Sequence, residues 1–158
     1  MSTGSTGTTS STDYDTIVVG SDGSPSSFLA VERAASIAAA FDATLVIGCA
    51  YYDSEDEVAQ SSAVRRDSVP VLGDETARKN LDAAAEHARS AGATKVETVV
   101  QSGTPVQALM AIVNEHNADL LVVGNRGINT LTGRLLGSVP ADIARQSDCD
   151  VMIVHTVS

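Results

Sequence analysis

Short apolar runs alternate along the chain with longer segments in which apolar residues recur at helical spacing. The runs carry little polar alternation, which is typical of strands covered by helices on both faces. The pattern predicts five strands, at Thr16–Gly20, Thr44–Ala50, Val96–Val100, Leu120–Gly124 and Val151–His155. It predicts four helices between them, from Pro25 to about Phe41, from Asp74 to about Ala91, from Pro105 onward, and from Val139 to Gln146.

Two of these helix starts carry capping signals. Ser24 and Thr104 each stand before a proline, and a hydroxyl side chain followed by proline is a typical helix N-terminus. Because strands and helices alternate throughout, we expect an α/β fold, a single-domain doubly wound parallel five-stranded sheet with helices on both faces. We take the strand order to be 3-2-1-4-5, which sets the first and fourth strands side by side.

Ligands of such sheets bind beyond the carboxyl ends of the strands, at the point where the strand order reverses. In the assumed order, two glycine-containing segments meet there: the turn from Gly20 to Ser24, and the segment from Val122 to Pro140. The second segment runs from a strand through spaced glycines into a helix. Glycine lets a ligand approach the main chain closely, and a helix start favours negative charge. The sequence therefore predicts a phosphate cradle at this crevice.

Composition limits the classes of partner and compartment. Residues 1–12 are almost entirely Ser, Thr and Gly and are predicted to form a disordered tail, leaving 13–158 as one domain. An excess of 20 acidic over 10 basic residues disfavours nucleic acid and anionic membrane surfaces. Without a membrane-length apolar run or the features of a signal peptide, a cytoplasmic location is expected. Residues 51–73 show no sustained period and are predicted to form a long loop that either covers the ligand or is solvated.

The motifs disfavour several other functions of α/β proteins. The first turn has Gly20-x-x-Gly23, whereas a dinucleotide fingerprint needs Gly-x-Gly-x-x-Gly, so NAD is disfavoured. Gly137 is followed directly by Ser138 without the lysine of a Walker loop. A phospho-receiver of similar topology would carry an aspartate after the third strand, where this chain has Gln101.

No catalytic or metal site emerges from the sequence. The cysteines, Cys49 and Cys149, have neither a CxxC spacing nor a neighbouring histidine. The three histidines, His87, His116 and His155, are scattered over two helices and the last strand. We therefore expect no catalytic residue and no dedicated protein metal site.

At the glycine-rich segment the chain resembles the universal stress protein family, in its ATP-binding branch. The signature Gly-x2-Gly-x9-Gly-Ser is matched by Gly124, Gly127, Gly137 and Ser138, and the resemblance spans Tyr14 to Val157. It implies that Asp22 binds the adenosine end, with Gly20 and Ser21 shaping the turn, and that the backbone of Ala50 lies on the adenine side. It also implies a phosphate site, whose residues would be Val123, Gly124, Arg126, Gly127, Gly137, Ser138 and Val139, with Arg134 as a further candidate countercharge.

The resemblance implies a regulatory protein of the stress response that binds ATP or cyclic AMP, with Mg²⁺ possible beside ATP and at most weak ATP hydrolysis. Two alternatives stay open, an adenine-nucleotide α-hydrolase and a nucleotide-free interaction module. The strand Val151–His155 is at the sheet edge in the assumed order, and an apolar edge must be paired or covered. Family members form dimers through this strand, so a homodimer is expected here.

Overall fold

The computed structural model describes residues 13–54, 71–125 and 138–156 and contains one five-stranded parallel sheet. The strand order is β3-β2-β1-β4-β5, which confirms the expected topology and the α/β class. The strands are β1 Thr16–Gly20, β2 Thr44–Tyr51, β3 Lys95–Ser102, β4 Leu120–Gly124 and β5 Asp150–Val154.

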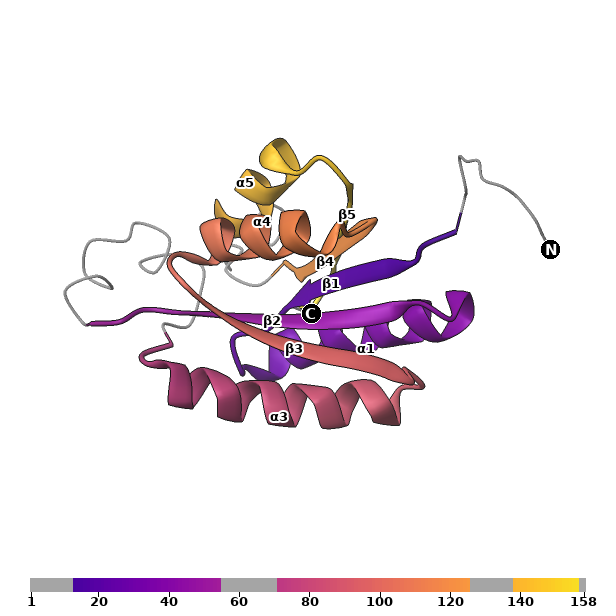
Figure 1. Ribbon diagram of the computed structural model, residues 1–158, viewed down its shortest axis with the longest axis horizontal. Helices are drawn as coiled ribbons and strands as arrows, with labels where there is room; N and C mark the ends of the chain where they lie inside the picture. Colours follow the sequence, from indigo (N-terminus) through magenta and orange to yellow (C-terminus); the bar gives the residue numbers. More distant parts are fainter. Residues whose placement is uncertain (1–12, 55–70, 126–137, 157–158) are drawn as a thin grey trace.

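Helices cover both faces of the sheet. On one face lie α1 (Pro25–Phe41) and α3 (Asp74–Ser90), and on the other lie α4 (Pro105–His116) and α5 (Ser138–Gln146) (Figure 1). None of the described helices is long and apolar enough to cross a membrane.

The inner strands β1, β2 and β4 are almost entirely apolar because the sheet separates two cores. Ile17, Val19 and Leu45 point toward α1 and α3, whereas Val18 and Val46, from the same strands, belong to the cluster under α4 and α5. Neighbouring positions of a strand thus face opposite cores, and neither face tolerates a polar residue.

The predicted caps are present at both helices. The Ser24 hydroxyl accepts a hydrogen bond from the Ser27 N–H at 3.1 Å. The Thr104 hydroxyl accepts from the Gln107 N–H at 3.3 Å, while the Gln107 side chain accepts from the Thr104 N–H at 3.2 Å. This reciprocal pair is a capping box, so the start of α4 is fixed by its local sequence.

Several predicted boundaries are wrong by one or two residues, most clearly at the edge strands. β3 pairs with β2 from Lys95 to Ser102 and is longer at both ends than the apolar run that predicted it. β5 pairs with β4 only up to Val154, so His155 lies after the strand rather than in it. Ladder pairing with the neighbouring strand decides these ends, and the polar residues at an exposed edge give no apolar signal.

The predicted loop 51–73 is wrong at its first residue. Tyr51 belongs to β2, and Tyr52 continues the ladder by pairing with the segment that precedes α3. The Tyr52 N–H donates to the Val71 carbonyl at 2.8 Å, and the Gly73 N–H donates to the Tyr52 carbonyl at 2.9 Å. The remainder of this prediction, residues 55–70, lies outside the described residues.

Candidate functional site

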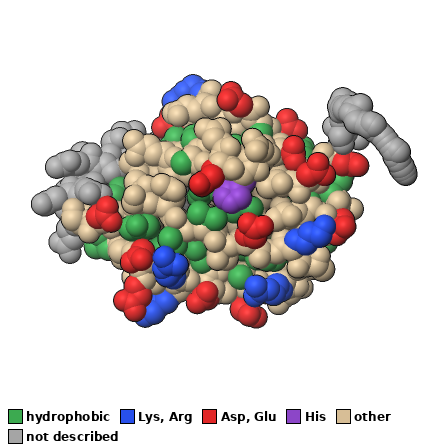
Figure 2. Space-filling model, viewed as in Figure 1, with side chains coloured by type: hydrophobic (Ala, Val, Ile, Leu, Met, Phe, Trp, Pro, Cys, Tyr) green, Lys and Arg blue, Asp and Glu red, His purple; other side chains and the backbone are tan. Residues whose placement is uncertain are grey.

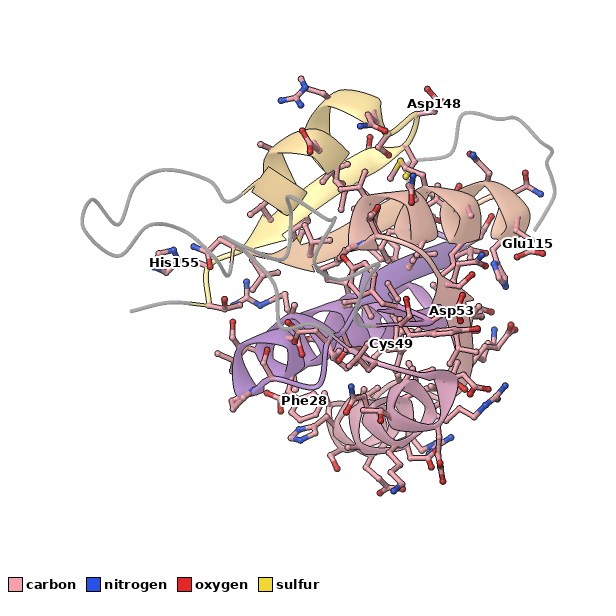
Figure 3. All side chains as sticks on the ribbon, turned by 90° about the vertical axis from the view of Figure 1, so that its left-hand side faces the viewer. Phe28, Cys49, Asp53, Glu115, Asp148 and His155 are labelled. Carbon is pink, nitrogen blue, oxygen red and sulfur yellow. The ribbon has the colours of Figure 1, made fainter. Side chains whose placement is uncertain are left out.

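The strand order reverses between β1 and β4, and the carboxyl ends of these two strands carry the candidate site. They are paired neighbours, from Ile17 with Leu120 to Val19 with Val122. Figure 3 looks toward the carboxyl ends of the strands. The turn after β1 and the first residues after β4 therefore lie at one crevice, as the topology requires.

The turn after β1 is held by its own side chains. Ser21 is buried, its N–H donates to the Gly48 carbonyl at 2.9 Å, and its hydroxyl lies 3.1 Å from that of Ser27. The Asp22 carboxylate accepts from the Ser24 N–H at 2.9 Å. Asp22 thus supports the turn directly before α1, with its side chain half-buried at the crevice.

Asn80, on α3, is a site residue that the sequence did not reveal. Its side-chain amide donates to the Asp22 carbonyl at 3.3 Å, which ties the turn to the helix packed beside it. Gly23 has a φ of 84°, and a Cβ there would lie 2.5 Å from the Asn80 side chain. The turn therefore needs glycine both for its left-handed backbone and for the room that Asn80 takes.

At the end of β2, the described residues leave a gap in backbone pairing on the side of β1. Successive strand residues direct their N–H and C=O groups to opposite sides. Gly48 faces β1, because its carbonyl accepts from the Ser21 N–H, and Tyr52 faces the segment 71–73 on the same side. Ala50, midway between them, must face that side too, but β1 has already ended at Gly20. Its N–H and C=O are thus directed between the turn after β1 and the segment 71–73.

Below this gap lies the thiol of Cys49, which Figure 3 shows near the centre of the molecule. Burial raises the pKa of Cys49 to about 11, against a smaller lowering effect of a hydrogen bond with Asn80. The thiol therefore stays protonated near neutral pH and donates a weak hydrogen bond to the Ala50 carbonyl at 3.6 Å.

The end of β4 is joined to the chain after β5. Val123 is buried in the cluster under α4 and α5, and Gly124 is half-buried. Asn125 is 4% exposed, its N–H donates to the Val154 carbonyl at 2.9 Å, and its side chain accepts from the Thr156 N–H at 2.8 Å. The glycine-rich segment thus starts from a fixed point.

Arg126, Gly127, Gly137 and the candidate countercharge Arg134 lie outside the described residues. Ser138 and Val139 are the first two residues of α5, so the helix begins one residue earlier than predicted.

The chain is strongly acidic. The chain carries a net charge of -10, and Figure 2 shows acidic side chains spread over the face in view. Within residues 13–54, 71–125 and 138–156, no group of three or more His, Cys, Asp or Glu could hold a metal ion. His87 is instead paired with Glu32 at 2.8 Å and stacked on Phe28.

Comparison with known proteins gives consistent matches over most of the chain. The model of the universal stress protein family matches residues 13–155. Universal stress protein Rv1636 of Mycobacterium tuberculosis is 48% identical over 143 residues, which cover 90% of this chain and 97% of that protein. A universal stress protein crystallised in complex with cAMP superimposes with a TM-score of 0.72 and 44% identity, covering 92% of this chain and all of the other.

A more distant structure, the universal stress protein from Archaeoglobus fulgidus in complex with dAMP, has a TM-score of 0.65. It is 18% identical and covers 89% of this chain and 98% of its own, so it bears on the fold alone.

Proposed function

Because the chain belongs to the universal stress protein family, we propose that it binds an adenine nucleotide and acts in stress adaptation as a regulator that senses or sequesters this ligand. The cAMP bound to the protein of 44% identity supports the ligand class. The nucleotide would lie across the crevice between β1 and β4, with its base toward β2 and its phosphate toward the glycine-rich segment.

The observation that carries the proposal is the pairing gap at Ala50. Ala50 there directs an N–H donor and a C=O acceptor to the same side, and the carbonyl, which accepts only a weak bond from the Cys49 thiol, has a second lone pair for a ligand. Adenine carries an amino donor beside a ring-nitrogen acceptor, so it pairs with these two groups as a further strand would. Guanine and hypoxanthine carry a carbonyl oxygen in place of the amino group, which sets two acceptors against each other.

The ribose and phosphate are assigned to the two glycine-containing segments. Asp22 would accept from the adenosine end, within a turn shaped by Gly20 and Ser21. On the other side, the phosphate would meet the main chain of Val123, Gly124, Gly127 and Gly137 and the N-terminal amides of α5 at Ser138 and Val139. Arg126 would supply countercharge.

The choice between ATP and cyclic AMP depends on charge. A triphosphate carries about four negative charges and a cyclic monophosphate one, so ATP needs more countercharge in an acidic protein. We propose that both compete for one site, that ATP binds with Mg²⁺ and that cyclic AMP binds without it.

Calorimetry tests this proposal. Cyclic AMP and ATP are titrated separately, with and without magnesium, and then in competition, with cyclic GMP as the control for the base. We expect mutually exclusive binding of the two adenine ligands and magnesium dependence for ATP alone. Additive binding would contradict a shared site, and no heat with any adenine nucleotide would contradict the proposed function.

A variant pair tests the glycine-rich segment. Gly127→Val should abolish binding in a protein that still folds, because side-chain bulk would occupy the phosphate path. Ala111→Val, an equal addition of bulk at an exposed position of α4, serves as the control. Equal affinities for the two variants would remove Gly127 from the site.

We further propose that the protein binds its nucleotide without turning it over rapidly. Prolonged incubation with ATP and magnesium distinguishes this from an α-hydrolase, because a hydrolase would release AMP and pyrophosphate over many turnovers. Release well beyond one equivalent per chain would contradict the regulatory role.

The exposed edge of β5 supports a homodimer. Val154 faces β4, since its carbonyl accepts from the Asn125 N–H. By alternation, Val151 and Ile153 direct their backbone groups outward, where a second copy could pair. Light scattering should give twice the chain mass of 16.2 kDa at micromolar concentration, and Ile153→Pro, which removes one outward N–H, should shift the mass toward one chain. A wild-type mass of one chain would contradict the dimer.

A further inference from the structure

Thr156 connects three parts of the fold at the end of β4. Its N–H and its hydroxyl both donate to the Asn125 side-chain oxygen, at 2.8 and 3.0 Å. Because its hydroxyl proton is used in this way, its oxygen accepts from the Ser26 hydroxyl at 2.8 Å. The chain after β5 is thereby fixed to the residue that follows β4 and to the first turn of α1.

The Asn125 amide has hydrogen-bond partners at both its oxygen and its nitrogen. Its oxygen takes both bonds from Thr156, so its NH₂ group faces Nδ1 of His155 at 2.9 Å. A buried amide with these partners has one favourable orientation, which fixes where the main chain enters the residues after 125.

Gly124 lies against the same threonine. A Cβ built on Gly124 would come within 3.2 Å of the Thr156 methyl group Cγ2, while its next neighbours, Thr156 Oγ1 and Ala30 Cβ, lie at 3.4 and 3.9 Å. The φ angle of Gly124 is not positive, so the backbone there does not itself require glycine. An alanine Cβ at this position would thus crowd the Thr156 methyl group, which would have to shift by a few tenths of an ångström to admit it.

We propose that Gly124 and Asn125 are positioning residues for the nucleotide site and that both act through Thr156. Asn125 holds the start of the glycine-rich segment to Thr156, and the absence of a side chain at Gly124 lets Thr156 sit close enough to be held. The inference rests on the proposed function, because the segment so positioned is the one assigned to the phosphate.

A double-mutant cycle tests the inference. The effect of Gly124→Ala on cyclic AMP affinity is measured twice, in the wild-type protein and in the Thr156→Ser variant, by calorimetry. Serine keeps the hydroxyl but lacks the methyl group that the new Cβ would meet. We expect Gly124→Ala to weaken binding about tenfold in the wild type and less than about twofold in the serine background, a coupling typical of residues in contact.

Thr156→Ser should also reduce the effect of Gly124→Ala on thermal stability, measured without any nucleotide. Gly124→Ala should lower Tm by a few degrees in the wild type and by less in Thr156→Ser. This measurement tests the Gly124–Thr156 contact even if the protein binds no nucleotide. In that case the proposed function is contradicted, and the melting data alone decide whether the contact is present.

Asn125 is tested by a second cycle. Asn125→Ala removes the acceptor of both Thr156 bonds, and Thr156→Val removes the hydroxyl while keeping the size and shape of the side chain. Each should weaken cyclic AMP binding, and the double variant should be little weaker than Asn125→Ala alone. Thr98→Val, at an exposed position of β3, is the control for loss of a hydroxyl.

Two results would overturn the inference. One is an unchanged loss of affinity for Gly124→Ala in the serine background, which would mean that the added Cβ meets the ligand. The other is that Asn125→Ala lowers Tm but leaves the cyclic AMP affinity of the folded protein unchanged, which would mean that Asn125 has a structural role alone.

Discussion

Gly23→Ala should destabilise the protein more than the same substitution at Gly73. The φ angles are 84° and 81°, so both alanines adopt the left-handed conformation, which costs about 1–2 kcal/mol. The two sites differ in their surroundings. A Cβ on Gly23 would lie 2.5 Å from the Asn80 side chain, whereas a Cβ on Gly73 has nothing within 4 Å.

Asn80 must move to admit the Gly23 Cβ, and its hydrogen bond to the Asp22 carbonyl is then lost. A hydrogen bond of this kind contributes about 0.5–1.5 kcal/mol. We therefore expect Gly23→Ala to lower the free energy of unfolding by about 1.5–3.5 kcal/mol, compared with about 1–2 kcal/mol for Gly73→Ala.

Urea unfolding followed by circular dichroism measures both losses. The matched background is Asn80→Ala, in which the obstacle is gone and Gly23→Ala should cost no more than Gly73→Ala. Equal losses for the two glycines in the wild-type protein would refute the role of Asn80 in holding the turn.

Three further predictions concern the sheet and its helices. Burial raises the pKa of Cys49 from 9.0 to about 11, so the stability that the protonated thiol contributes should be complete below about pH 9 and lost as the pH rises through 11. In urea unfolding, the free energy of unfolding of the wild-type protein should therefore fall more steeply above pH 9 than that of Cys49→Ala. The same pH dependence in both proteins would contradict this prediction. Thr104→Ala should lower the unfolding free energy by about 1 kcal/mol through loss of the capping box, measured in the same way, and no loss would contradict it. Gly48→Ala should lower the free energy of unfolding by about 1–3 kcal/mol, because its Cβ would lie 2.6 Å from Ile112 Cδ1. In an Ile112→Val background most of this loss should disappear, and an equal loss in both backgrounds would contradict the contact.

The sequence predicted the parts of the fold that depend on short-range signals. β1 and α1 were predicted within the observed bounds because an apolar run and a Ser24-Pro25 start are local features. The alternating elements predicted a parallel sheet, and the strand order that was assumed for it is confirmed by the structure. The ends of β3 were missed because Lys95 and Ser102 are polar residues that pair on an edge strand.

The candidate site depends on contacts between distant residues, which one sequence does not reveal. Asn80 donates to Asp22 across 58 positions, and nothing in the helix pattern marks it. The glycine spacing identified Gly124 but gave no sign that Thr156 occupies the space beside it. The gap at Ala50 likewise becomes visible only when the end of β1 is set against the longer β2.

The pairing gap at Ala50 is tested most directly by calorimetry with cyclic AMP and cyclic IMP, which differ at the position that carries the adenine amino group. Hypoxanthine would place a carbonyl oxygen opposite the Ala50 C=O, which would then lack a hydrogen-bond donor from the ligand. An unpaired buried group of this kind lowers the binding free energy by about 1–3 kcal/mol, or roughly 5- to 150-fold in affinity. We predict that cyclic AMP binds more tightly by a factor in this range. Equal affinities for the two ligands would contradict recognition of adenine by the main chain of β2.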